Sequence, residues 1–338
     1  MVLNVPLFAQ EPRVTAAAQA ALTLMRDWFG PLNRPTGAVP VRLPWLAPAR
    51  DQQTERLVID GIVRDYWTDQ SVPLSEFGEI VVAYVSAQAI HQQLEGSNFE
   101  TVRFFGGSVP FPLRSVLLSP PVADPRPRVW RFDDPGHMLT REMARGVRAL
   151  QTIERYVGWP AMLETLSALR AAGPSQLSAE SFGEQLSQIR GTDMRFLINE
   201  CFRPDATYDY AVAALKSEPG APGLMETTVT IVRAGTGRFA LEDDGESDAA
   251  MPMMVRFADG SEFRDLFDGA APSATMVYSA KSAAVSAIVD PDAMLLLDVN
   301  RDNNAIVRDA PTSKLGIRLA MHWLAWLQNA MLSYTALV

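Results

Sequence analysis

The chain has 338 residues, 48% of them hydrophobic and 20% charged, which is ordinary for a folded protein with a sizeable core. Its formal net charge is -9 and it has no run of lysine and arginine, so we expect no nucleic-acid partner. The single cysteine, Cys201, excludes an internal disulfide and a metal site built from thiolates, and we expect it to be a buried structural thiol.

Apolar residues recur at helical spacing as far as Phe202, with glycine or proline between the periodic segments. Two other stretches interrupt them: residues 37–46 form a short β-like run broken by prolines, and Pro110–Pro135 is proline-rich and predicts an extended surface segment. The pattern predicts helices over Ala16–Trp28, Arg56–Trp67, Ser75–Leu94, Thr140–Val157, Pro160–Ala172, Ser178–Gln188 and Asp193–Phe202.

Near Gly220 the hydrophobic period changes from that of a helix to that of a strand. The acidic stretch Leu241–Ala250 is interpreted as a loop, and the ADGS turn at residues 258–261 predicts a hairpin. Short strands at this spacing indicate a small β-sandwich. The predicted strands are METTVTIVRAG, MPMMVRF with SEFRDLF, ATMVYSA, AAVSAIVDP and MLLLDVN.

The two ends of the sequence raise the question of location. The first residues have neither a basic region nor a long apolar core, so we expect no signal peptide. Leu319–Val338 has no formally charged side chain and is long enough either for a helix docked on the protein or at an interface, or for a membrane span. The expected location is therefore cytoplasmic or membrane-associated.

Several stretches, taken in order, carry a resemblance to a known family. They are LTLMRDWFGP, MARGVRALQTIERYVGW, the block from SAESFGEQ to ATYDYAV, and the β-rich tail with FADGSEF and LLLDVNRDNN. Their order and spacing resemble the alanyl aminopeptidase family of gluzincin zinc metallopeptidases, in its bacterial form, from about Ala16 to Asn304. The large amino-terminal β domain of that family has no counterpart here.

The resemblance implies an α+β fold. A mostly helical, gluzincin-like (thermolysin-like) domain is expected over residues 1–217 and a small β-sandwich domain over residues 224–305. An apolar C-terminal helix is expected over residues 312–338.

The zinc helix of this family carries H-E-x-x-H, in which two imidazoles bind the metal and the glutamate polarises its water. The matching stretch here is VIDGIVRDYW, with Asp60, Gly61 and Arg64 at the three functional positions. Aspartate can bind zinc, but arginine has no free lone pair and glycine offers no base. The resemblance therefore implies a degenerate site.

The family's third ligand is a glutamate in a pattern like E-G-x-A-x-Y. GEIVVAYVS matches with Glu79 at the ligand position and Tyr84 at the aromatic one, and Glu76 is a second candidate. Met143 in MARG stands where the catalytic tyrosine is expected, with Arg145 and Gly146 retained after it. A thioether cannot donate a hydrogen bond to an oxyanion, so this position is degenerate as well.

We interpret these changes as an ion pair in place of a metal: Arg64 needs an anion, and both Asp60 and Glu79 are suitable. The alternative is a surface pair of Asp60 with Arg64 and a solvated Glu79. The three histidines are scattered. His91 and His137 are interpreted as caps of a helix end and a turn, and His322 as a polar-face residue.

The predicted function is a catalytically inactive aminopeptidase-like protein that acts as a scaffold or as a peptide- or partner-binding module, with no catalytic residue, cofactor or metal expected. One alternative is a zinc metallo-aminopeptidase with an atypical ligand set of Asp60, Glu79 and His91 or His137. Another is a membrane-attached accessory module anchored by Leu319–Val338.

Overall fold

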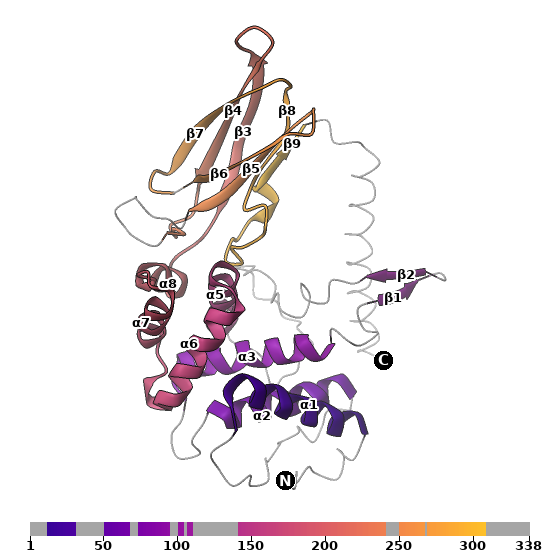
Figure 1. The fold of residues 1–338 in the computed structure, drawn as a ribbon, viewed down its shortest axis with the longest axis vertical. Coiled ribbons are helices and arrows are strands. Elements are labelled where there is room, and N and C mark those ends of the chain that lie inside the picture. The colour runs from indigo at the N-terminus through magenta and orange to yellow at the C-terminus, as the bar shows by residue number, and fades with distance from the viewer. Residues whose placement is uncertain are drawn as a thin grey trace. The chain divides into compact units, whose positions relative to one another are not determined.

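The computed structural model describes residues 12–31, 51–67, 74–94, 101–104, 107–110, 141–240, 250–267 and 269–308 (Figure 1). These residues form α-helices and antiparallel sheets, so the α+β class is confirmed. They divide into two compact units, a mainly helical one that ends at Pro204 and a β-rich one that begins at Asp205.

The seven helices predicted in the first unit are all confirmed, with ends that differ by a few residues. A β-hairpin of β1 (Thr101–Phe104) and β2 (Gly107–Pro110) follows the third helix, and a short 3-10 helix η2 (Pro174–Gln176) follows the fifth. The helices are α1 (Pro12–Phe29), α2 (Asp51–Trp67), α3 (Glu76–Leu94), α5 (Arg141–Val157), α6 (Trp159–Ala172), α7 (Ala179–Arg190) and α8 (Arg195–Phe202).

Helix α3 is central in this unit because it contacts both α2 and α5 (Figure 1). Apolar side chains of α3 and of its neighbours are buried, including Val81 on α3, Ile62 on α2 and Leu150 on α5. Gly146 lets α5 approach α3 closely: a Cβ atom at this position would lie 2.4 Å from Cδ1 of Ile80. The glycine is therefore required by packing.

Arg170 of α6 joins the ends of the first two helices. Its Nε donates to the carbonyl oxygen of Tyr66 (3.0 Å), and its Nη1 donates to that of Phe29 (2.6 Å). The guanidinium also lies 5.1 Å from the centre of the Tyr66 ring. A cation at helix C-terminal ends is favourable because the last carbonyl groups have no partner within the helix.

The described residues of the second unit form two antiparallel sheets and the short 3-10 helix η3 (Arg301–Asn303). One sheet has the strand order β3-β4-β7 and the other β6-β5-β8-β9. The strands are β3 (Tyr210–Pro219), β4 (Met225–Arg233), β5 (Met251–Phe257), β6 (Glu262–Phe267), β7 (Ser273–Ala280), β8 (Ala284–Val289) and β9 (Ala305–Val307).

The ADGS hairpin is confirmed between β5 and β6. In its turn the Asp259 carboxylate accepts hydrogen bonds from the backbone N (2.9 Å) and the hydroxyl (2.6 Å) of Ser261, and Gly260 has φ 87°. An aspartate that binds the backbone two residues on and a glycine with positive φ are the usual components of such a turn.

Two predictions for this unit are wrong. The change from helix to strand lies before Tyr210 rather than near Gly220, because β3 pairs with β4 along its whole length. MLLLDVN (residues 294–300) forms turns and a single bridge instead of a strand. Here the Asp290 carboxylate accepts hydrogen bonds from the backbone N of Met294 (2.6 Å) and Leu295 (3.0 Å), which hold the chain in a turn.

Four predictions fall outside the described residues: the β-like run at 37–46, the extended segment at 111–135, the loop at 241–249 and the C-terminal helix at 312–338. Within the described part of the chain, no helix has the length and apolar character needed to cross a membrane.

Candidate functional site

Arg64, in the last turn of α2, and Glu79, in the first turn of α3, form a bidentate ion pair. Nη1 donates to Oε1 over 2.7 Å, and Nη2 donates to Oε2 over 2.6 Å. The two side chains are 42% and 31% exposed. The hydrogen bonds to Glu79 raise the pKa of the Arg64 guanidinium, and burial opposes them. Both carboxylate oxygens of Glu79 thus face one permanent cation.

Asp60 lies one turn before Arg64 on the same helix and makes a separate contact with α3. Its Oδ1 accepts a hydrogen bond from the hydroxyl of Ser86 (3.0 Å), which is buried. The charge of Asp60 also helps to raise the pKa of Arg64. Two polar contacts therefore join α2 to α3. The sequence indicated the contact of Arg64 with Glu79 but not the contact of Asp60 with Ser86.

The other predicted site residues lie nearby along the helices but have different surroundings. Gly61 is partly exposed on α2, and Glu76 is exposed at the start of α3. Met143 is half-buried in the first turn of α5. Gly146 lies one turn after Met143 and packs against Ile80, which follows Glu79 in the sequence. The beginning of α5 therefore lies beside the beginning of α3.

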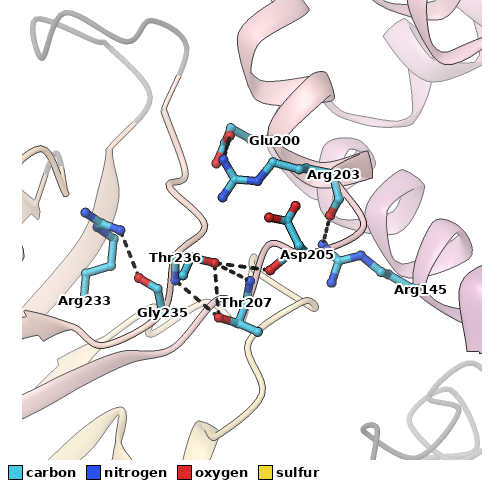
Figure 2. Close-up of polar contacts among 8 residues, drawn as sticks. All are labelled: Arg145, Glu200, Arg203, Asp205, Thr207, Arg233, Gly235 and Thr236. Atoms are coloured by element: carbon cyan, nitrogen blue, oxygen red, sulfur yellow. Dashed lines mark hydrogen bonds and ion pairs between the residues drawn. The ribbon is translucent and has the colours of Figure 1, made fainter.

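Arg145, retained in the family-like pattern, has a structural contact (Figure 2). Its Nη2 donates to the backbone carbonyl of Arg203 at the end of α8 (2.8 Å). Arg203 in turn pairs with Glu200 over 2.6 Å within the same helix end. This contact attaches α8 to α5.

A buried polar cluster joins α3 to α5 and was missed by the sequence analysis. The Tyr84 hydroxyl donates to Oε2 of Glu154 (3.0 Å), and Nε2 of Gln88 donates to the same oxygen (2.5 Å). Tyr84 and Gln88 are buried. The signal available was the pair Ser86 and Gln88 in the mostly apolar middle of α3, but a partner 66 residues away cannot be predicted from spacing.

In the β-rich unit, a pair of threonines closes the turn after β4 onto the chain that enters β3 (Figure 2). The backbone N of Thr207 donates to Oγ1 of Thr236 (3.1 Å), and the backbone N of Thr236 donates to Oγ1 of Thr207 (3.3 Å). Gly235 beside them leaves no room for a side chain, because a Cβ would lie 2.0 Å from the carbonyl oxygen of Thr207. This arrangement is structural.

The predicted metal ligands can be placed only in part. His91 belongs to α3, but the structure does not describe its side chain. His137 and His322 lie outside the described residues. Among the residues that are described, no three or more histidine, cysteine, aspartate or glutamate side chains gather as a metal-binding group. Cys201 is buried, as predicted.

Comparison of the sequence with protein-family models found no match, and comparison with curated proteins found none either.

Proposed function

We propose that this chain is a non-catalytic, aminopeptidase-like protein that acts as a scaffold or binds a peptide or protein partner. The observation that carries the proposal is the bidentate pair of Arg64 with Glu79. In the resemblance stated above, these two residues stand at two zinc-ligand positions. The pair supports the replacement of a metal by an internal cation.

The chemistry of the donors argues against zinc at these positions. Zinc binds deprotonated oxygen, nitrogen or sulfur donors, and a guanidinium stays protonated at every accessible pH. Arg64 would repel a divalent cation at short range, and it already engages both oxygens of Glu79. The donor set of Asp60, Arg64 and Glu79 therefore does not fit a zinc ion while the ion pair is intact.

The two other roles of a metallopeptidase would also lack their side chains. Gly61 offers no carboxylate to deprotonate a water molecule, and Met143 offers no hydroxyl to stabilise an oxyanion. Removal of a single oxyanion donor typically lowers the rate by ~10²–10³. Peptide hydrolysis by this site is therefore not expected.

The gluzincin-like identity of the helical region and the β-sandwich form of the second unit are parts of the same proposal. Two hydrogen bonds support the sandwich, since each joins a strand of one sheet to a strand of the other. The Tyr278 hydroxyl on β7 donates to Oδ2 of Asp265 on β6 (3.0 Å), and the backbone N of Ala284 on β8 donates to the hydroxyl of Ser217 on β3 (3.1 Å). The domain limits 1–217 and 224–305 and the C-terminal helix remain predictions.

The test is the zinc content of the dialysed full chain together with an alanyl-anilide hydrolysis assay, with and without added zinc. The proposal expects substoichiometric zinc and no hydrolysis above a heat-denatured control. The alternative zinc enzyme, with Asp60, Glu79 and a histidine as ligands, expects one zinc per chain. It also expects turnover that a chelator abolishes and that Glu79→Gln destroys, and that result would contradict the proposal.

A further inference from the structure

Strand β6 is an exposed edge strand of the second unit. It is the last strand in the order β6-β5-β8-β9, and no other described strand pairs with its outer edge. Five of its six residues are exposed, including Phe263 (42%) and Leu266 (55%). A proline or a β-bulge commonly blocks an edge strand, and β6 has neither. Its outer edge can therefore pair with another strand.

The hydrogen bonds of the hairpin show which residues of β6 face this outer edge. The backbone N of Phe257 on β5 donates to the carbonyl oxygen of Ser261 (2.9 Å), so Ser261 and every second residue after it direct their backbone groups toward β5. The backbone groups of Glu262, Arg264 and Leu266 therefore face outward. The N of Leu266 is already engaged, because it donates to a carboxylate oxygen of the preceding aspartate (2.8 Å). Glu262 and Arg264 remain for a partner strand.

Glu262 and Arg264 have opposite charges, and this complementarity favours a second copy of the chain as the partner. Two β6 strands that pair antiparallel about a two-fold axis at Phe263 place Glu262 of each copy opposite Arg264 of the other. Each of these two pairs can exchange two backbone hydrogen bonds and adds the attraction of opposite charges. An axis at Arg264 would instead place two arginines opposite each other, which is destabilising.

The side chains of both residues are accessible for this contact. Within the chain Glu262 pairs with Arg256 (2.6 Å) and Arg264 pairs with Asp292 (3.0 Å), but all four side chains are between 38% and 64% exposed. Ion pairs this exposed contribute little, so each charge can also interact with a second partner. The half-exposed Phe263 would lie beside its counterpart at the axis and lose contact with water.

We propose that the β6 edge, residues 262–266, is the interface of a homodimer in which the sheet continues from one copy into the other. The paired segment is short, and interfaces below about 1,200 Å² are typical of weak, transient association. The dissociation constant is therefore expected in the micromolar range. The proposal is separate from the Arg64–Glu79 pair and does not depend on the proposed function.

Sedimentation velocity of the full chain over a range of concentrations tests the interface by charge reversal. Glu262→Arg or Arg264→Glu alone should weaken dimerisation at least about tenfold, because each creates two like-charged pairs in the dimer. The double variant restores both pairs and should dimerise within about threefold of the wild type. Arg256→Glu is the matched control. It breaks the pair of Glu262 within the chain but lies on β5, so it should dimerise like the wild type.

Phe263→Cys provides a second readout that does not depend on charge. The axis brings the two Cα atoms of this residue to about 4.5 Å, the spacing of a non-hydrogen-bonded antiparallel pair, which a disulfide can bridge. The native cysteine, Cys201, is buried. With oxidised glutathione the variant should form a disulfide-linked dimer. Leu266→Cys, at a more exposed position away from the axis, should not.

Three results would overturn the proposal. The first is a monomer at every concentration. The second is a dimer that neither single charge reversal weakens, or that the double variant fails to restore. The third is equal cross-linking of Phe263→Cys and Leu266→Cys, because exposure alone would then account for the disulfide.

Discussion

Arg64 keeps its positive charge at every accessible pH, so its contribution to stability depends on the anion beside it. Glu79→Gln removes that anion and leaves the guanidinium facing a neutral amide. We expect a loss of about 1 kcal/mol in the free energy of unfolding, at the upper end for ion pairs in contact with water, because the pair is bidentate and only partly exposed. Denaturation by urea measures this loss.

Glu76→Gln is the matched control for that experiment. Glu76 shares the first turn of α3 with Glu79, so both substitutions remove the same favourable interaction with the helix N-terminus. Glu76 is exposed, and its substitution should change the free energy of unfolding by less than about 0.5 kcal/mol. Equal losses in the two variants would show that the ion pair adds nothing beyond the helix dipole.

Tyr210 offers a prediction about alkaline stability. Burial raises the pKa of its phenol from 10.0 to about 12, and the hydroxyl accepts a hydrogen bond from the backbone N of Phe239 (3.0 Å). Between about pH 10 and 12 the unfolded chain loses this proton while the folded chain keeps it. The free energy of unfolding therefore falls as the pH rises through this window.

Tyr210→Phe separates the two effects. At neutral pH it leaves the buried N–H of Phe239 without its acceptor and should cost about 1–2 kcal/mol. Above about pH 10 the variant has no phenol to ionise at this position, so its deficit relative to the wild type should shrink as the pH approaches 12. Urea denaturation at several pH values measures both, and a deficit that stays constant with pH would contradict the assignment.

Among the elements, the helices could be predicted from apolar spacing, but β3 could not. Its buried residues include Val212 and Leu215, and a register shift between Val212 and Ala214 breaks the alternation that marks a strand. Pairing with β4 decides the conformation. In MLLLDVN the opposite error occurred: three consecutive leucines suggested a strand, but hydrogen bonds from backbone N–H groups to the Asp290 carboxylate hold the chain in turns.

The candidate site shows the same limit. Arg64 and Glu79 were placed as partners from their charges and their helices, since a guanidinium at this spacing needs an anion. Glu154 carries no such signal, because an acid within a long amphipathic helix usually faces solvent. Its contacts with Tyr84 and Gln88 arise only when α5 packs on α3.

The α3–α5 contact itself can be tested at Gly146. Gly146→Ala would place a Cβ against three side-chain atoms of Ile80, and overpacking of this kind typically costs about 1–3 kcal/mol. Gly183→Ala in α7 is the matched control, because its Cβ would lie 3.4 Å from the nearest atom, an ordinary contact. Alanine is the better helix former by about 0.5–1 kcal/mol, so this control should be neutral or stabilising. Similar destabilisation in both variants would refute the close approach.

At the scale of the molecule, the two compact units have separate sets of buried residues. Units with their own cores can unfold independently. We expect scanning calorimetry of the full chain to show two transitions. Gly146→Ala should lower only the transition of the helical unit, and Tyr210→Phe only that of the β-rich unit. A single transition that both substitutions shift equally would mean that the units unfold together.

If Arg64 stands at a former metal-ligand position, Arg64→His should restore a zinc donor there, and zinc titration of this variant measures the effect. The introduced imidazole would join Asp60 and Glu79, restoring three zinc donors on α2 and α3, while Gly61 still offers no base. We predict that the variant binds one zinc per chain without gaining hydrolysis and that the wild type binds none. Arg195→His, beside the exposed Asp193, should also bind none. Stoichiometric zinc on the wild type, or no gain of zinc binding in Arg64→His, would contradict the replacement of a metal ion by the Arg64–Glu79 pair.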